Sequence, residues 1–272
     1  MALTTKKRAK ELKHDKFRDT TFDAYGRLAH RFEGKGRTIL YAVGGAVALV
    51  ALVLAFNWWS ERRADAARLA LGQAIKIAET PVVSGTPQPG VTGPSYATEQ
   101  ERAQKAVEAF QKVQNDYGSP YKELARYFAA TNLLSVDRPK GLGELEALSK
   151  DGDADVAARA RFALAQAREA DAQYDAAAAL YQELLKNTSS AVSPNVVKLR
   201  LASVYEKQGK KDDAVNLLFQ MVEAARNAKG KDGKPLPEST VTRTAADKLQ
   251  ELSPERYAQL PKAPTPAGDL GF

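Results

Sequence analysis

The stretch from Arg37 to Arg63, RTILYAVGGAVALVALVLAFNWWSERR, constrains the fold more than any other part of this chain of 272 residues. Between Ile39 and Phe56 it contains no charged and no strongly polar side chain. An α-helix rises ~1.5 Å per residue, so Thr38–Trp59 would cover a hydrocarbon core of about 30 Å. The pattern predicts a transmembrane helix at residues 38–59.

A cleaved signal peptide and a buried core helix are the alternatives. A signal core is shorter than this run, and the basic region before it is far longer than a usual n-region. A core helix would normally show a polar face, whereas aromatic residues mark both ends here, with Tyr41 near one end and Trp58 and Trp59 at the other. We therefore expect an anchor that stays in the mature protein.

The distribution of basic residues predicts the orientation of the anchor. Residues 1–37 carry 11 Lys/Arg and 5 Asp/Glu, which accounts for nearly all of the chain's net charge of +7. In the twenty residues after Ser60, the basic residues are Arg62, Arg63, Arg68 and Lys76. The positive-inside rule then places the N-terminus in the cytoplasm and residues 60–272 across the membrane, which is the periplasm of a bacterium. Arg62 and Arg63 lie near the wrong end of the span, so the reversed topology stays open.

Two features of the N-terminal part have two interpretations each, one as an interaction site and one as an ordinary property of a membrane anchor. Gly44, Ala48, Ala51 and Ala55 form a small-residue face that would let this helix pack on another in the bilayer, although such residues are common in spans. In the basic cytoplasmic head, 1–37, apolar residues recur at helical spacing between Phe17 and Phe32. This amphipathic helix would lie on the membrane or dock on a partner, or the head is a basic tail that only signals topology.

After the span, the sequence predicts a helix and then a linker. Residues 60–79 continue as a helix with an apolar stripe of Ala67, Leu71, Ala74, Ile75 and Ala78. Residues 80–97 contain TPVVSGTPQPGVTGPSY, with four prolines and three glycines, which indicates a Pro/Gly linker without helix or sheet.

Residues 98–252 show helical periodicity almost throughout, divided by short breakers that include Gly118–Pro120, Gly152, Gly209 and Gly230–Pro237. Residues 137–150, with Pro139, Gly141 and Gly143, are expected to be too short for a full second helix. The fold class is therefore all-α, a single transmembrane helix followed by a helical-hairpin solenoid.

A degenerate repeat lies within this region. Leu201-Ala202-x2-Tyr205, Gly209 and Ala214-x3-Leu218 match the tetratricopeptide pattern, and Leu164-Ala165 with Ala177-x3-Tyr181 matches again 37 residues earlier. Ala165, Ala177, Ala202 and Ala214 are expected where the two helices of a hairpin cross closely. Large residues are expected to fill the space between hairpins, and Tyr181, Tyr205 and Phe128 are assigned to the core.

The first helix of each hairpin supplies the candidate binding residues, because concave solenoid surfaces bind peptides and partner helices. By the repeat register the inner-face positions are Lys122, Arg126, Arg159, Phe162, Gln166, Ser203 and Lys207. The plain alternative is a solvated face. Ser253-Pro254-Glu255 predicts a final capping turn, so that 253–272 comprises this turn and a disordered tail.

No catalytic or cofactor-binding motif is present in the sequence. Cysteine is absent, both histidines precede the apolar run, and no phosphate loop, dinucleotide fingerprint, nucleophile elbow or zinc-protease motif occurs. The DGDAD stretch at 151–155 lacks the acid that a calcium loop needs at its twelfth position, so it is interpreted as a turn and N-cap. We expect no enzyme activity, no cofactor, no metal and no nucleic-acid partner.

The order of basic head, uncleaved span and repeat domain resembles the ancillary SecYEG translocon subunit family (YfgM-like). The segments LASVYEKQGKKDDAVNLL and YDAAAALYQELL carry the resemblance, whereas the long head and the linker depart from it. The resemblance implies an accessory component of the protein-export translocon, with translocon subunits and periplasmic chaperones as partners. The alternative is a general envelope scaffold for cell division, secretion or outer-membrane assembly. A homo-oligomer stays open.

Overall fold

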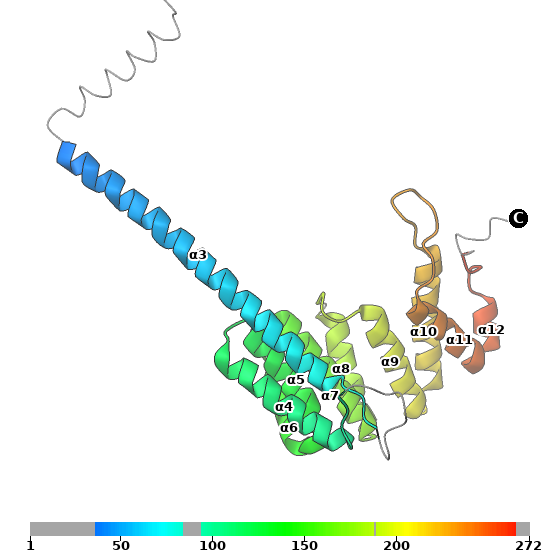
Figure 1. Cartoon of the computed structure of the whole chain (residues 1–272). Helices are drawn as coiled ribbons and strands as arrows, with labels where there is room; N and C mark the ends of the chain where they lie inside the picture. The colour runs from blue at the N-terminus through cyan, green and yellow to red at the C-terminus, as the bar shows by residue number, and fades with distance from the viewer. Residues whose placement is uncertain (1–35, 84–93, 188, 265–272) are drawn as a thin grey trace, which may run out of the picture. The chain divides into compact units, whose positions relative to one another are not determined.

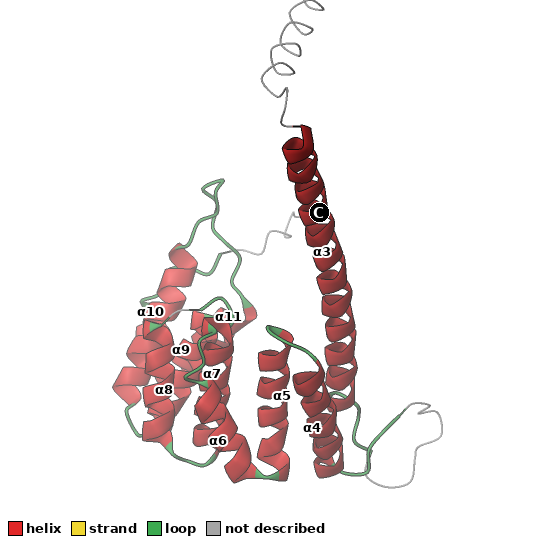
Figure 2. Ribbon diagram, turned by 90° about the vertical axis from the view of Figure 1, so that its left-hand side faces the viewer, coloured by secondary structure: helices red, strands yellow, loops and turns green. Residues whose placement is uncertain are grey.

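The computed structural model describes residues 36–83, 94–187 and 189–264, and these residues form helices joined by short loops (Figures 1 and 2). The helices are α3 (Gly36–Ala78), α4 (Glu99–Asp116), α5 (Tyr121–Val136), α6 (Arg138–Leu148), α7 (Ala154–Ala170), α8 (Tyr174–Lys186), α9 (Pro194–Lys207), α10 (Lys211–Asn227), α11 (Thr240–Leu252) and α12 (Pro254–Ala258). The described part contains no β-strand, only two isolated bridges. The amphipathic helix expected in the head, the centre of the linker and the end of the tail lie outside the described residues.

Helix α3 is unbroken over 43 residues, and the chain divides into two units between Ala64 and Asp65. In the first unit, every residue from Leu40 to Trp59 is exposed. In the second unit, Ala67, Leu71 and Ala74 are buried. The helix therefore begins as an apolar rod that no described residue covers and ends as a core element of the second unit.

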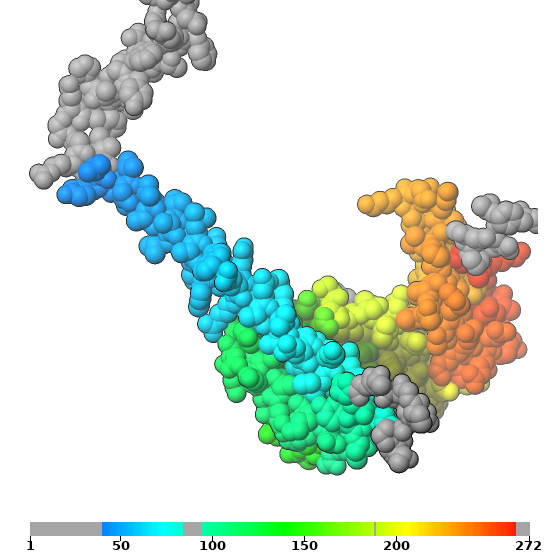
Figure 3. All heavy atoms as spheres, in the orientation of Figure 1, coloured from blue at the N-terminus to red at the C-terminus, as the bar shows by residue number. Residues whose placement is uncertain are grey.

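The second unit is built from helical hairpins. The end of α3 pairs with α4, and the following pairs are α5 with α6, α7 with α8, and α9 with α10 (Figure 1). Helix α5 also contacts α7, and α9 contacts α11. Helices α11 and α12 pack on α10 and cover the last pair, as the orange and red atoms show (Figure 3). The all-helical, tetratricopeptide-like repeat expected from the sequence is confirmed.

Small residues lie where the helices of a pair cross. Ala165, Ala177, Ala202 and Ala214 are each at most 1% exposed, as the repeat pattern predicts. Tyr181 is fully buried, whereas Phe128 is half-buried and stacks on Phe110 with ring centroids 5.3 Å apart.

Tyr205 is half-buried and packs against two adjacent core clusters, one formed by α7–α9 and one by α9–α12. It therefore fills the space between hairpins, as expected.

Local sequence signals set the ends of several helices. The Asp153 carboxylate accepts hydrogen bonds from the backbone N–H groups of Asp155 and Val156, so DGDAD is a turn and an N-cap of α7. Ser253 caps α12 in the same way by accepting from the N–H of Arg256. Gly209 ends α9 with φ of +75°, a conformation that glycine adopts at low cost.

Residues 137–150 differ from the expectation, because α6 occupies 11 of them. Pro139 lies in the first turn, where a missing N–H costs nothing. Gly141 does not break the helix. It lies where α5 and α6 approach closely, since a Cβ there would lie 2.8 Å from the backbone nitrogen of Leu134.

The linker also differs from the expectation of a segment without sheet structure. Its ends are joined by a bridge between Val82 and Tyr96, with the Val83 N–H donating to the Tyr96 carbonyl.

Candidate protein-binding surfaces

The seven candidate binding residues do not form one surface. Lys122 and Arg126 on α5 line a groove together with α4 and α6. On α7 the corresponding groove, between α6 and α8, is lined by Arg161, Leu164 and Arg168. An α-helix turns about 100° per residue, so Arg159, Phe162 and Gln166 lie on a face of α7 roughly opposite to that groove. The inner-face positions predicted on α5 and those predicted on α7 therefore lie on different sides of the solenoid.

The other candidate residues differ in their burial and in the contacts that their side chains already make. Phe162 is half-buried and packs on Tyr181 with ring centroids 5.9 Å apart, so it contributes to the core as well as to the surface. The Ser203 hydroxyl donates to the carbonyl of Leu199 in the same helix. Arg159 and Gln166 are half-buried on α7. Their role in binding stays a prediction.

Lys207 belongs to a polar cluster that joins α7, α8 and α9. The Nζ of Lys207 lies 3.2 Å from Oε1 of Glu169, whose side chain is 9% exposed. The same Nζ lies over the ring of Tyr174. The Tyr181 hydroxyl donates to Oε2 of Glu169 across 3.2 Å. Burial, with the nearby Glu169 carboxylate, raises the pKa of Tyr181 well above its usual value. Because Glu169 would otherwise be a buried unpaired charge, the first role of Lys207 is to pair with it.

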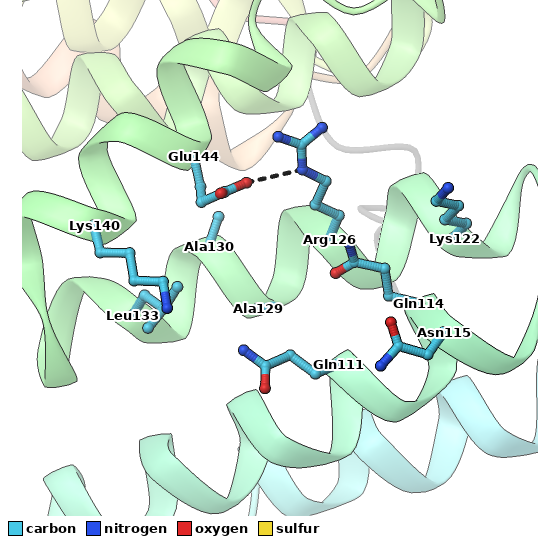
Figure 4. A pocket seen from close by; sticks show the side chains of 10 residues that line it. All are labelled: Gln111, Gln114, Asn115, Lys122, Arg126, Ala129, Ala130, Leu133, Lys140 and Glu144. Atoms are coloured by element: carbon cyan, nitrogen blue, oxygen red, sulfur yellow. Dashed lines mark hydrogen bonds and ion pairs between the residues drawn. The ribbon is translucent and has the colours of Figure 1, made fainter.

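We call the groove between α4, α5 and α6 the α5 groove. It has a volume of about 510 Å³ (Figure 4). Its lining residues come from all three helices and are Gln111, Gln114, Asn115, Lys122, Arg126, Ala129, Ala130, Leu133, Lys140 and Glu144. Amides of α4 and the lysine and glutamate of α6 border it, and the small residues of α5 form its floor (Figure 4).

The α5 groove carries an excess of positive charge. Arg126 Nε donates to Glu144 Oε2 across 2.8 Å, and the two side chains are 34% and 37% exposed. Lys122 and Lys140 are exposed, and within the described ranges neither makes an ion pair. The groove therefore presents the ammonium groups of Lys122 and Lys140 beside the ion pair of Arg126 and Glu144.

The groove beside α7, of about 400 Å³, differs in its electrostatics. Arg161 donates to the Ser149 carbonyl across 2.6 Å and pairs with Glu183 across 3.2 Å. Its guanidinium is thus already satisfied within the repeat. Lys150 pairs with Glu146 across 3.7 Å, and Arg168 donates to the side-chain amide oxygen of Gln173 across 2.9 Å. The two grooves occupy equivalent places in successive hairpins, but the cations of the groove beside α7 each have a side-chain partner, whereas Lys122 and Lys140 have no ion-pair partner among the described residues.

A third hollow, of about 360 Å³, lies between the end of α3 and α4. It is mainly apolar and is bordered by Leu69, Ile77 and Tyr117 among others. Leu69 is 67% exposed at the edge of this hollow. Over residues 36–83, 94–187 and 189–264, no three His, Asp or Glu side chains are grouped closely enough to hold a metal ion.

Comparisons with known proteins agree with the repeat geometry of α9 and α10. Residues 199–232 match the family model described as a tetratricopeptide repeat. The chain therefore carries a tetratricopeptide-like repeat domain. Repeats of this class present surfaces for binding other proteins.

Two solved structures are similar to the chain. Both are crystal structures of a putative kinesin light chain with nearly identical TPR-like repeats from Podosopora anserina, one of them a single-residue variant. Each is 15% identical, covers 68% of this chain and 84% of its own, and superposes with a TM-score of 0.47. No curated protein sequence matches the chain.

Proposed function

We propose that this protein is a single-span membrane-anchored scaffold whose repeat domain binds other proteins. The observation that carries the proposal is the exposure of every residue from Leu40 to Trp59 on an apolar helix that continues into the repeat domain. This helix is long and apolar enough to cross a bilayer. Exposing so much apolar surface to water is unfavourable, and a lipid environment removes that cost.

Contacts at the end of the apolar run support the same proposal. The Arg62 guanidinium lies 4.3 Å from the centre of the Trp58 ring, and that of Arg63 lies 5.3 Å from the Trp59 ring. Tryptophan and arginine side by side suit the boundary between acyl chains and headgroups. These contacts support an end of the proposed span near residue 59.

The charge asymmetry supports an orientation with the basic head in the cytoplasm and the repeat domain in the periplasm of a bacterial inner membrane. The resemblance of the architecture to ancillary translocon subunits favours one role, an accessory component of the export machinery that links it to periplasmic folding factors. A general envelope scaffold with partners of another class is the alternative.

Two experiments test the proposal. Membranes containing the full chain are extracted with alkaline carbonate, and reporters are fused after Phe272. We expect the chain to resist extraction, an alkaline phosphatase fusion to be active, and a fusion to an ordinary fluorescent protein to be dark. Release by carbonate would contradict the anchor, and a bright fluorescent fusion would contradict the orientation.

The translocon role is tested by crosslinking in intact membranes followed by purification in mild detergent. Translocon subunits or periplasmic chaperones should be recovered with the full chain. If they are consistently absent while division, secretion or outer-membrane assembly proteins are enriched, the general envelope scaffold is the correct role.

A further inference from the structure

We propose that the α5 groove binds an extended, acidic segment of a partner protein. The proposal rests on the proposed function of the repeat domain as a protein-binding module, and it names the chemistry of one partner. Three properties of the groove carry it: its charge, its amide side chains and its floor.

The charge of the groove favours an anionic ligand. Lys122 and Lys140 approach it from different helices, and neither has an ion-pair partner among the residues that the structure describes. The Nε of Arg126 is used by Glu144, which leaves its remaining N–H groups for a ligand (Figure 4). Carboxylates that are spaced along an extended chain can meet these cations one after another.

The amide side chains distinguish a peptide from other anionic polymers. Gln114 and Asn115 follow Gln111 by three and four residues, so both lie next to it on α4, and all three border the groove (Figure 4). Amides both donate and accept hydrogen bonds, which matches the alternating N–H and C=O groups of a peptide backbone. A phosphate polymer offers only acceptors, so the oxygen atoms of these amides would receive no hydrogen bond from it.

The floor gives the groove its depth. Ala129 and Ala130 are buried small residues, and Leu133 adds an apolar contact next to them. Larger side chains at these positions would fill part of the volume of about 510 Å³. The groove beside α7 differs in its charge, because Lys150, Arg161 and Arg168 there already have the side-chain partners Glu146, Glu183 and Gln173.

The test uses the full chain in lipid nanodiscs and a fluorescein-labelled decapeptide of alternating glutamate and serine, with binding followed by fluorescence anisotropy. The double variant Lys122→Glu, Lys140→Glu should weaken binding by at least about tenfold, because like charges then face the peptide. The matched control Lys211→Glu, Lys231→Glu changes the net charge equally at exposed positions outside the groove, and should leave the affinity within about twofold. Circular dichroism confirms that all variants are folded.

A second variant pair tests the amides. Gln111→Leu with Asn115→Leu should weaken the decapeptide but leave the binding of labelled inorganic polyphosphate, wherever on the chain it occurs, unchanged. Absence of decapeptide binding would overturn the proposal. Equal binding to the groove and control variants would overturn it too, since the peptide would then bind elsewhere on the chain, such as at the basic head. Stronger competition by polyphosphate or by anionic vesicles at the groove would overturn it as well. Membrane extraction and crosslinking test the scaffold function without this peptide, so the two failures are distinguishable.

Discussion

At the residue scale, the two glycines of α6 show how one residue type has different roles. A Cβ at Gly141 would lie 2.8 Å from the nitrogen of Leu134 and 3.0 Å from the carbonyl oxygen of Ala130, both backbone atoms that cannot rotate away. A Cβ at Gly143 would meet nothing within 4 Å. From the sequence, both glycines were expected in a segment too short for a full second helix. The close approach of α5 that requires Gly141 is not encoded in the neighbouring residues.

We predict opposite effects for the two alanine substitutions. Gly141→Ala should lower the free energy of unfolding by about 1–3 kcal/mol, since α5 and α6 must move apart. Gly143→Ala should raise it by about 0.5–1 kcal/mol, because alanine restricts the unfolded chain and favours the helix. Urea denaturation of the full chain in detergent, followed by far-UV circular dichroism, measures both. Equal effects at the two positions would refute the close crossing.

At the element scale, the second half of α3 belongs to the repeat domain. The sequence indicated the stripe of Ala67, Leu71 and Ala74 but placed the start of the solenoid at residue 98. In the structure, Leu71 and Ala74 share a core cluster with Phe110 of α4 and with residues of α5. The apolar stripe alone could not identify what it packs against, because the linker separates it from α4 in the chain.

Two leucines of α3 test this assignment. Leu71 is 8% exposed and Leu69 is 67% exposed, although they are separated by one residue. Leu71→Ala should cost about 2–4 kcal/mol of unfolding free energy, from lost burial and the cavity that remains. Leu69→Ala should change it by less than about 0.5 kcal/mol. The same urea titration separates the two, and a small effect at Leu71 would mean that α3 does not contribute to the core.

At the scale of the whole molecule, the apolar run and the core are separate. All four clusters of buried residues in the described part of the chain lie after Ala64. The first unit contributes exposed apolar residues between Leu40 and Trp59. The stability of the repeat domain and the attachment to a membrane should therefore be independent properties.

A chain that begins at Asp65 is predicted to be soluble and folded. It keeps every core residue of the repeats and loses the apolar run that demands lipid. We expect a monodisperse protein in detergent-free buffer, with a thermal transition close to that of the repeats in the full chain. Aggregation, or loss of a cooperative transition by circular dichroism, would mean that the first unit contributes to the fold.

The sequence by itself determined the helical class, the apolar run, several caps and the small residues at the crossings. These depend on local periodicity, on the conformational preferences of glycine, proline and serine, and on the size of a side chain. Tertiary structure alone decided that Gly141 is a contact, that α3 enters the core, and which face of α5 carries Lys122 and Arg126. Those properties depend on which helices meet and at what rotation, and a shift of one residue in register rotates a side chain by about 100° around the helix axis.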